Sequence, residues 1–243
     1  MTIENKINKR DFIKDAFKGI DIKLTELQID QFIQYYEMLI IWNKVVNLTT
    51  IVEFEDVVLK HFVDSIYLSK LIILEDQNII DVGTGAGFPG IPLKIVYPNL
   101  KIVLLDSLNK RIKFLKLLVD KLGLNNVECI HSRAEDLGHN LQYRELFDIS
   151  ISRAVAKLSI LSEYCLPFVK KDGIFISYKS MNIEIELEES KSAIKKLSGK
   201  VKTVNKYLLP DTDINRSIVI IEKKAKMNKN FPRTAGKPSK EPL

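Results

Sequence analysis

Hydrophobic positions follow two different spacings along the chain. Up to residue 75 the spacing is helical, and Thr25 followed by Gln28 matches a capping box at the start of the longest run. Apolar residues then recur every three or four positions, at Ile29, Phe32, Ile33, Tyr36, Leu39 and Ile40. Two shorter helical stretches, 54–60 and 64–73, follow. This pattern predicts a helical extension over residues 1–75, packed on the domain that follows.

Residues 76–224 change to short apolar runs that alternate with amphipathic segments. Runs rich in Ile, Val and Leu predict seven strands, at 79–82, 102–106, 127–131, 147–152, 173–178, 201–208 and 217–222. The segments between them predict helices at 91–96, 109–122, 158–169 and 183–197. Because helices separate most of these strands, we expect an α/β domain with a mostly parallel sheet. The short link 210–215 leaves no room for a helix, so the last two strands should form an antiparallel hairpin. This layout resembles that of the Rossmann-like S-adenosylmethionine-dependent methyltransferases.

A glycine-rich motif, DVGTGAGFPG at 81–90, follows the first predicted strand and opens a helix. Glycines let the backbone turn sharply and approach a ligand, and a helix N-terminus presents free N–H groups. The carboxylate of Asp81 would repel a pyrophosphate, but it suits the ammonium of an amino-acid ligand or the surroundings of a sulfonium. We therefore predict a cofactor site with Asp81, Gly83, Gly85 and Gly87. A tight turn without a ligand is the alternative.

Acidic and small residues follow the next two predicted strands. Asp106 ends the second strand, where a carboxylate can accept hydrogen bonds from ribose hydroxyls. Such an acid serves NAD and S-adenosylmethionine equally well, and a helix N-cap is its structural alternative. After the third strand, Ala134 and Glu135 could border an adenine ring, or they belong to a solvated loop.

Three arginines, Arg111, Arg133 and Arg153, follow strands on the same predicted edge of the sheet. Their convergence predicts an anion there, either an RNA phosphate or the carboxylate of a ligand.

Charge is concentrated in the tail at 225–243. The chain has 37 Lys and Arg against 31 Asp and Glu, a net charge of +6. From Glu222 onward there are seven basic and two acidic residues, so this end holds +5 and the remainder only +1. The tail is predicted to act either as a basic arm for RNA or as a strap over the domain.

Other classes of protein are not supported by composition. Two Cys and three scattered His give no disulfide framework and no metal site. No run of about 20 apolar residues or signal-peptide core occurs, so we expect a cytoplasmic protein without a membrane segment.

Together these motifs resemble one family, the bacterial small-subunit ribosomal RNA guanine N-7 methyltransferases, also known as glucose-inhibited division protein B or RsmG. The resemblance covers nearly the whole chain. Besides the glycine-rich motif, the matching segments are WNKVVNLT at 42–49, HFVDS at 61–65, LLDS at 104–107, SRAE at 132–135, ISRA at 151–154 and FPRTAGKPSKEPL at 231–243.

The resemblance implies binding residues for S-adenosylmethionine and adds one to the basic residues already expected to meet RNA. Its cofactor contacts correspond to Gly83, Phe88, Ala134, Glu135 and Arg153, with Asp106 as the ribose partner. Lys179 matches a basic residue after the fifth strand. The residues expected to meet RNA are Arg111, Arg133, Arg153, Lys179 and Arg233. The implied substrate is a guanine of 16S rRNA, free or in the 30S particle, and we expect a monomer.

The implied chemistry needs no catalytic base. Guanine N-7 has a lone pair and no proton, so in-line attack on the sulfonium methyl depends on positioning and exclusion of water. We therefore assign no catalytic residue. His61 and Asp64 share a helical face, and either fix the extension against the domain or take part in acid–base chemistry.

Two other functions stay open at this point. A small-molecule methyltransferase would share the fold and cofactor motif, but it would need neither the basic tail nor the arginines. A non-enzymatic nucleotide-binding regulator, NAD-linked for example, would use only the glycine-rich turn. Methyl transfer to rRNA, to 30S particles or to metabolites separates the three.

Overall fold

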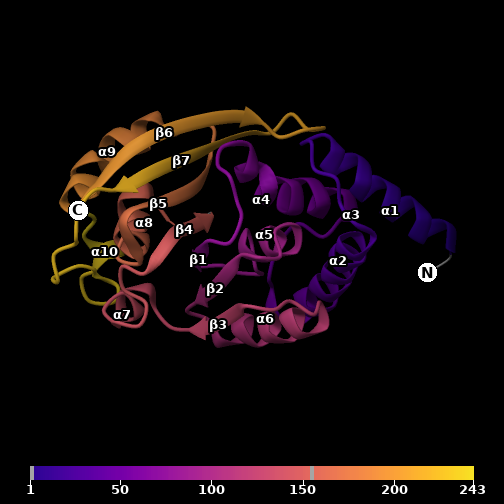
Figure 1. Cartoon of the computed structure of the whole chain (residues 1–243), viewed down its shortest axis with the longest axis horizontal. Helices are drawn as coiled ribbons and strands as arrows, with labels where there is room; N and C mark the ends of the chain where they lie inside the picture. The colour runs from indigo at the N-terminus through magenta and orange to yellow at the C-terminus, as the bar shows by residue number, and fades with distance from the viewer. Residues whose placement is uncertain (1–2, 154–155) are drawn as a thin grey trace.

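One mixed sheet runs through the molecule (Figure 1), which is a computed structural model that describes residues 3–153 and 156–243. Within these residues the strands are β1 (Asn78–Val82), β2 (Lys101–Asp106), β3 (Val127–His131), β4 (Phe147–Arg153), β5 (Val169–Ser180), β6 (Gly199–Leu208) and β7 (Asn215–Lys223). Their order across the sheet is β3-β2-β1-β4-β5-β7-β6. β1 to β5 are parallel, whereas β7 is antiparallel to both β5 and β6. The predicted α/β sheet with a C-terminal antiparallel hairpin is confirmed.

The central strands β1 and β2 bury both of their faces, because neighbouring apolar residues point to opposite sides. On β1, Ile79 belongs to one hydrophobic cluster and Ile80 to another. Leu104 and Leu105 on β2 divide in the same way. The first cluster is covered by the N-terminal helices with α5 (Gly90–Val96) and α6 (Asn109–Lys121), and the second by α8 (Leu158–Cys165) and α9 (Glu184–Lys196) (Figure 1).

The N-terminal part of the chain is helical, as predicted. Its elements are α1 (Ile3–Lys18), α2 (Glu26–Val46), α3 (Phe54–Val57), the π-helix η1 (Val58–Val63), α4 (Asp64–Ile66) and the 3₁₀-helix η2 (Tyr67–Lys70). The capping box is confirmed, since Gln28 N–H donates to Thr25 Oγ1 at 3.3 Å and Thr25 N–H donates to Gln28 Oε1 at 2.8 Å.

The prediction of two separate helical stretches at 54–60 and 64–73 is wrong. Helical structure is continuous from Phe54 to Lys70, because a π-turn replaces the expected break. The amide of Asp64 reaches back to the carbonyl of Leu59, five residues earlier, so the helix widens without ending. π-turns of this kind are frequent at functional sites.

The helix predicted at 158–169 is too long. α8 ends at Cys165, and Val169 is already the first residue of β5, paired with Phe147 of β4. Leu166 and Phe168 are buried although they belong to a turn. The run of apolar residues therefore extends beyond the end of the helix. Ala154, in the segment 151–154 that carried part of the resemblance, lies outside the described residues.

The C-terminal tail lies against the domain. Its Met227 is buried in the second hydrophobic cluster, and Arg233 forms an ion pair with Glu163 of α8 at 2.7 Å. The short helices α7 (Ala134–Leu137) and α10 (Lys237–Lys240) lie near each other at this end of the molecule (Figure 1). Of the two roles predicted for the tail, the structure favours the strap.

Candidate functional site

Two cavities open where the parallel strands end, and the first lies over β1, β2 and β3. It has a volume of about 240 Å³. Gly83, Asp106, Ala134 and Glu135, four of the residues predicted to bind the cofactor, line this cavity. The remaining lining residues include Tyr164 of α8 and Ser239 of the tail.

The glycine-rich turn is shaped by backbone conformations that favour glycine. Gly83, Gly85 and Gly87 have φ angles of 71°, 63° and 101°. The Gly85 amide donates to Asp106 Oδ2 at 3.0 Å, which joins the turn to the end of β2. Gly87 faces away from the cavity, because a Cβ atom there would lie 2.8 Å from the hydroxyl of Tyr35. Gly83 therefore forms the cavity wall, while Gly87 permits close packing with α2.

Asp81 supports this turn from below. Its carboxylate is fully buried, and Oδ2 accepts hydrogen bonds from Thr84 Oγ1 at 2.8 Å and from the Gly90 amide at 2.9 Å. Among the described residues Oδ1 has no partner. Burial raises the pKa of Asp81 to about 7. The sequence suggested that this carboxylate faces a ligand, but the structure places it beneath the turn and outside the lining of the cavity.

Asp106 is held rigidly at the floor of the first cavity. Oδ1 accepts from the Leu108 amide at 2.8 Å, and Oδ2 is 3.2 Å from the guanidinium of Arg111. The side chain is 2% exposed, so its charge is balanced by these donors and has little contact with solvent. A buried carboxylate with a fixed orientation is suited to bind the hydroxyls of a ribose.

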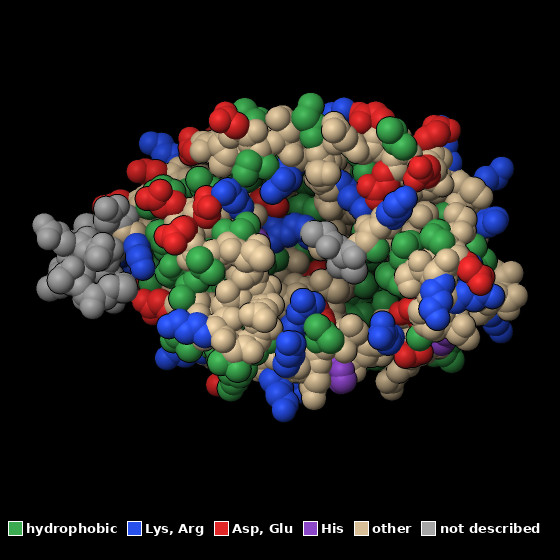
Figure 2. Space-filling model, turned by 180° about the vertical axis from the view of Figure 1, so that it is seen from behind, with side chains coloured by type: hydrophobic (Ala, Val, Ile, Leu, Met, Phe, Trp, Pro, Cys, Tyr) green, Lys and Arg blue, Asp and Glu red, His purple; other side chains and the backbone are tan. Residues whose placement is uncertain are grey.

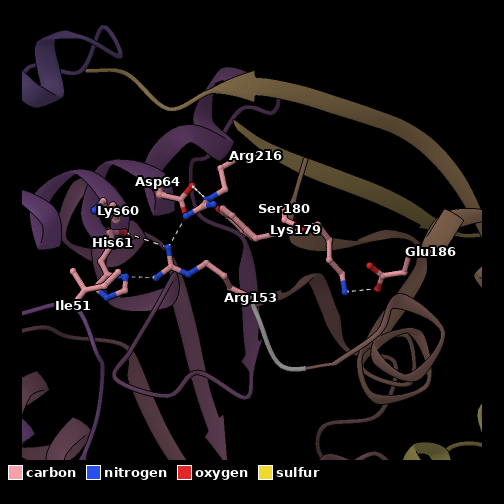
Figure 3. A pocket seen from close by; sticks show the side chains of 10 residues that line it. Ile51, Lys60, His61, Asp64, Arg153, Lys179, Ser180, Glu186 and Arg216 are labelled. Atoms are coloured by element: carbon pink, nitrogen blue, oxygen red, sulfur yellow. Dashed lines mark hydrogen bonds and ion pairs between the residues drawn. The ribbon is translucent and has the colours of Figure 1, made fainter. Parts of the chain in front are cut away.

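The second cavity, of about 400 Å³, lies beside the first, at the ends of β4, β5 and β7 (Figure 3). It is lined by four cationic side chains, Lys60, Arg153, Lys179 and Arg216, and by two carboxylates, Asp64 and Glu186. The two cavities are neighbours. Lys179, which lines the second cavity, donates at 2.6 Å from Nζ to the carbonyl of Ala156, which lines the first. The face in Figure 2 is hollowed near its centre, with Lys and Arg side chains gathered around the hollow.

Asp64 joins the helical extension to three strands at this cavity. Its carboxylate is 2% exposed, accepting from Arg153 at 2.8 Å and from the Tyr207 hydroxyl at 2.9 Å. Arg216 Nε lies 3.6 Å away on the same side (Figure 3). Since a buried carboxylate needs such partners, this cluster fixes α4 against β4, β6 and β7.

His61, on the π-helix, lies against the same arginine. The His61 ring stacks on that of Phe88 with centroids 4.5 Å apart, and Arg153 Cζ lies over the Phe88 ring, 5.1 Å from its centroid. Burial, with a smaller contribution from Arg153, lowers the pKa of His61 to about 3. Arg153 can only donate, so His61 Nδ1 is an acceptor and the proton belongs on Nε2, 2.9 Å from Thr49 Oγ1.

The residues predicted to meet RNA are distributed between the two cavities and the tail. Arg111 is paired with Asp106, and Arg153 with Asp64, so the three strand-end arginines do not converge on one point. Arg133 is exposed at the first cavity, which it lines.

Two more of these cations are held by carboxylates. Lys179 donates to Glu186 at 2.6 Å and is 9% exposed, although it lines the second cavity. The guanidinium of Arg233 donates to both carboxylate oxygens of Glu163, at 2.9 and 2.7 Å, and points into the domain.

Several cavity residues escaped the sequence analysis. Lys60 and Arg216 carry no local motif, and they reach the second cavity only because the extension and β7 meet there. Tyr164 lies near the C-terminal end of the amphipathic helix α8, where it resembles a core residue. Ser239 belongs to the tail segment that carried the resemblance, but it lies 104 residues from Glu135, its neighbour at the cavity.

The part of the chain that the structure describes holds no group of three or more His, Cys, Asp or Glu residues that could bind a metal ion. Within the same residues, every helix is too short or too polar to cross a membrane.

The chain resembles known proteins over nearly its full length. Residues 28–218 match the family described as rRNA small subunit methyltransferase G. The ribosomal RNA small subunit methyltransferase G of Acetivibrio thermocellus is 46% identical over 240 residues, 99% of each chain. Its counterpart from Thermoanaerobacter sp. (strain X514) is 50% identical over 94% of this chain and 96% of that protein. M. jannaschii TYW2 in complex with AdoMet superposes over 66% of this chain and 76% of its own, with a TM-score of 0.51 and 17% identity, and so shares the fold.

Proposed function

The chain belongs to the rRNA small subunit methyltransferase G family, and from this premise we propose that it methylates N-7 of a guanine in 16S ribosomal RNA. The methyl donor is S-adenosylmethionine. The observation that carries this proposal is the pair of neighbouring cavities at the carboxyl edge of the sheet, one with buried carboxylates and the other lined by four cations. In open α/β sheets, ligands bind at this edge.

The first cavity fits the nucleoside part of the cofactor. Asp106 would accept hydrogen bonds from the ribose, Gly83 would allow close approach of the backbone, and Glu135 would face the adenine. When bound, S-adenosylmethionine supplies an electrophilic methyl group on its sulfonium. The chain's own contribution is to hold that end of the cofactor beside the second cavity.

The second cavity would receive the target guanine. Its four cations against two carboxylates leave an excess of positive charge, which suits a nucleotide attached to a phosphodiester backbone. Arg153 is fixed by Asp64, so it can position a ligand without reorganising. The cationic lining is the feature that a methyltransferase for uncharged small molecules would not need.

Neither His61 nor Asp81 is suited to be a strong general base. With a pKa of about 3, His61 is neutral and only weakly basic at physiological pH. Asp81 is buried beneath the turn and does not line either cavity. Guanine N-7 has no proton to remove, so positioning and exclusion of water are sufficient for in-line transfer.

The test uses purified protein and cofactor labelled in its methyl group. The acceptors are free 16S rRNA, 30S particles and a metabolite extract, each in a separate reaction. We expect label in the rRNA of one or both RNA samples, recovered as 7-methylguanosine after nuclease digestion. Label confined to metabolites, or to another position of guanine, contradicts the proposal.

A matched pair of variants connects this activity to the first cavity. Asp106→Asn replaces one carboxylate oxygen by a donor and should weaken cofactor binding at least about tenfold. Asp120→Asn, at an exposed position of α6, should bind and methylate as the unchanged protein does.

A further inference from the structure

The last residues of the tail reach the first cavity. The Gly236 amide donates a hydrogen bond to Glu135 Oε1 at 2.8 Å. Ser239 lines the cavity together with Glu135 and Tyr164. Glu135 is 3% exposed, so its carboxylate orientation depends on the few groups that contact it.

This position of the tail is determined by a series of anchors along the domain. Arg144 donates to the carbonyl of Phe231 at 2.7 Å, and His139 Nε2 lies 2.7 Å from the carbonyl of Pro232. Gly138 lies directly beneath this segment, because a Cβ atom there would be 2.9 Å from Pro232 Cγ. Then Arg233 binds Glu163, which is 1% exposed. The tail is thus anchored to the domain just before it reaches Glu135.

We propose that residues 236–239 complete the cofactor cavity, with the Gly236 amide positioning Glu135 to accept a hydrogen bond from the adenine amino group. This inference rests on the proposed function for the identity of the cofactor. Glu135 Oε1 is occupied by Gly236, and its second oxygen is available for the exocyclic amine, a donor that a guanine or hypoxanthine ring lacks at that position. Gly236 is therefore a positioning residue for adenine recognition, and the tail acts on the cofactor before RNA is present.

The experiment measures binding of S-adenosylhomocysteine by calorimetry, without RNA. A chain that ends at Ala235 keeps the Arg233–Glu163 ion pair and lacks the groups at the cavity. We expect its affinity to fall about tenfold, the cost of leaving one charged acceptor without its donor. The control chain ends at Ser239, loses residues that do not line the cavity, and should bind within about twofold of the full chain.

A double-mutant cycle tests whether the tail acts through Glu135. Glu135→Gln keeps the acceptor for Gly236 but turns the second oxygen into a donor, and it should weaken binding about tenfold. If the tail only positions this carboxylate, Glu135→Gln in the chain ending at Ala235 costs little more than either change alone. Additive losses, about a hundredfold together, overturn the positioning role.

Hydrogen exchange on the full chain tests the same inference without truncation, and so does not depend on the shortened chain folding. Binding at Glu135 must stabilise the docked tail to the same extent that the docked tail favours binding. S-adenosylhomocysteine should therefore slow hydrogen exchange of the Gly236 amide about tenfold. Unchanged exchange, or unchanged ligand affinity with weakened rRNA binding, overturns the inference. If the full chain does not bind the nucleoside at all, the proposed function fails instead.

Discussion

Burial shifts the pKa values of His61 and Asp81 in opposite directions, and each shift favours the neutral form of the side chain. The two groups therefore change the pH dependence of stability in opposite ways. In the folded chain the pKa of His61 is about 3, below its ordinary value of 6.5. The unfolded chain therefore binds a proton between these two pH values while the folded chain does not. The free energy of unfolding is unaffected by His61 above pH 6.5 and falls as the pH drops from 6.5 towards 3.

Replacing His61 by Gln removes this dependence. Between pH 7.5 and pH 5, the free energy of unfolding of the unchanged protein should fall relative to that of His61→Gln by about 2 kcal/mol. The amide of Gln can still donate towards Thr49, so both proteins should remain folded. Urea unfolding at a series of pH values provides the measurement. Parallel profiles for the two proteins would show that His61 is not buried as a neutral ring.

In the same urea experiment, Asp81 should change the free energy of unfolding with pH in the opposite direction from His61. Its folded pKa of about 7 lies above the ordinary value of 3.8, so the folded chain binds more protons within that window. Asp81 therefore adds stability as the pH falls from 7 towards 4, and Asp81→Asn should abolish this gain. Asn can accept from Thr84 and from the Gly90 amide, which keeps the turn intact. If the free energies of unfolding of Asp81→Asn and the parent protein differ by the same amount at every pH, this prediction is contradicted.

At the scale of elements, the glycine-rich turn and helix α2 pack closely against each other at Gly87. A Cβ atom at Gly87 would be 2.8 Å from the Tyr35 hydroxyl and 2.8 Å from Ile91 Cγ1, and that hydroxyl donates to the carbonyl of Ala86 at 2.6 Å. Gly87→Ala should lower the free energy of unfolding by about 3 kcal/mol, because overpacking adds to the strain of a positive φ. Gly85→Ala is the matched control, with φ of 63° and no atom within 4 Å of the new Cβ.

For Gly85→Ala the backbone strain alone remains, and the expected loss is about 1 kcal/mol. Urea unfolding of both variants against the parent protein tests the difference. Equal losses would mean that α2 shifts freely away from the turn, and that the contact with Tyr35 does not determine how closely the helix packs.

Local patterns predicted most elements, because the strands are short apolar runs and the helices between them are amphipathic. They were less successful where contacts between residues distant in sequence determine burial or helix geometry. On α2, Tyr36 was assigned to the apolar stripe, yet Tyr35 is fully buried and Tyr36 only partly. The reason is that α2 packs against α1, α5 and α6, so its buried face is wider than a single stripe. The π-turn at 58–63 was not predicted from the local pattern either.

At the candidate site too, local patterns identified some residues and missed those that only tertiary contacts bring there. Gly83, Asp106 and Glu135 could be identified because each follows a strand, and strand ends share one edge of the sheet. Arg216 could not, because β7 approaches the helical extension only in the folded chain. Arg233 was expected to meet RNA on account of the basic tail, but its partner Glu163 lies 70 residues earlier. Charge alone does not show which cations are already paired.

At the scale of the whole molecule, the helical extension and the sheet share one hydrophobic cluster. Phe17, Phe32 and Phe62 of the extension belong to the same cluster as Leu104 and Phe114 of the domain. The free energy that stabilises each part therefore depends on the other, and a cooperative transition is expected for the chain as a whole. The single Trp of the chain, Trp42, offers a probe of this coupling.

Trp42 lies on α2 with its ring centroid 5.9 Å from that of Phe114 on α6, so its fluorescence reports the contact between extension and domain. We expect its unfolding transition in urea to coincide with that of far-UV circular dichroism, which follows all helices and strands. If S-adenosylhomocysteine binds in the first cavity, as the proposed function implies, it should shift both midpoints equally, since it stabilises the cooperative unit. If the fluorescence midpoint came first, or failed to move with the ligand, the extension would unfold independently, and the second cavity, built from both parts, would be lost before the first.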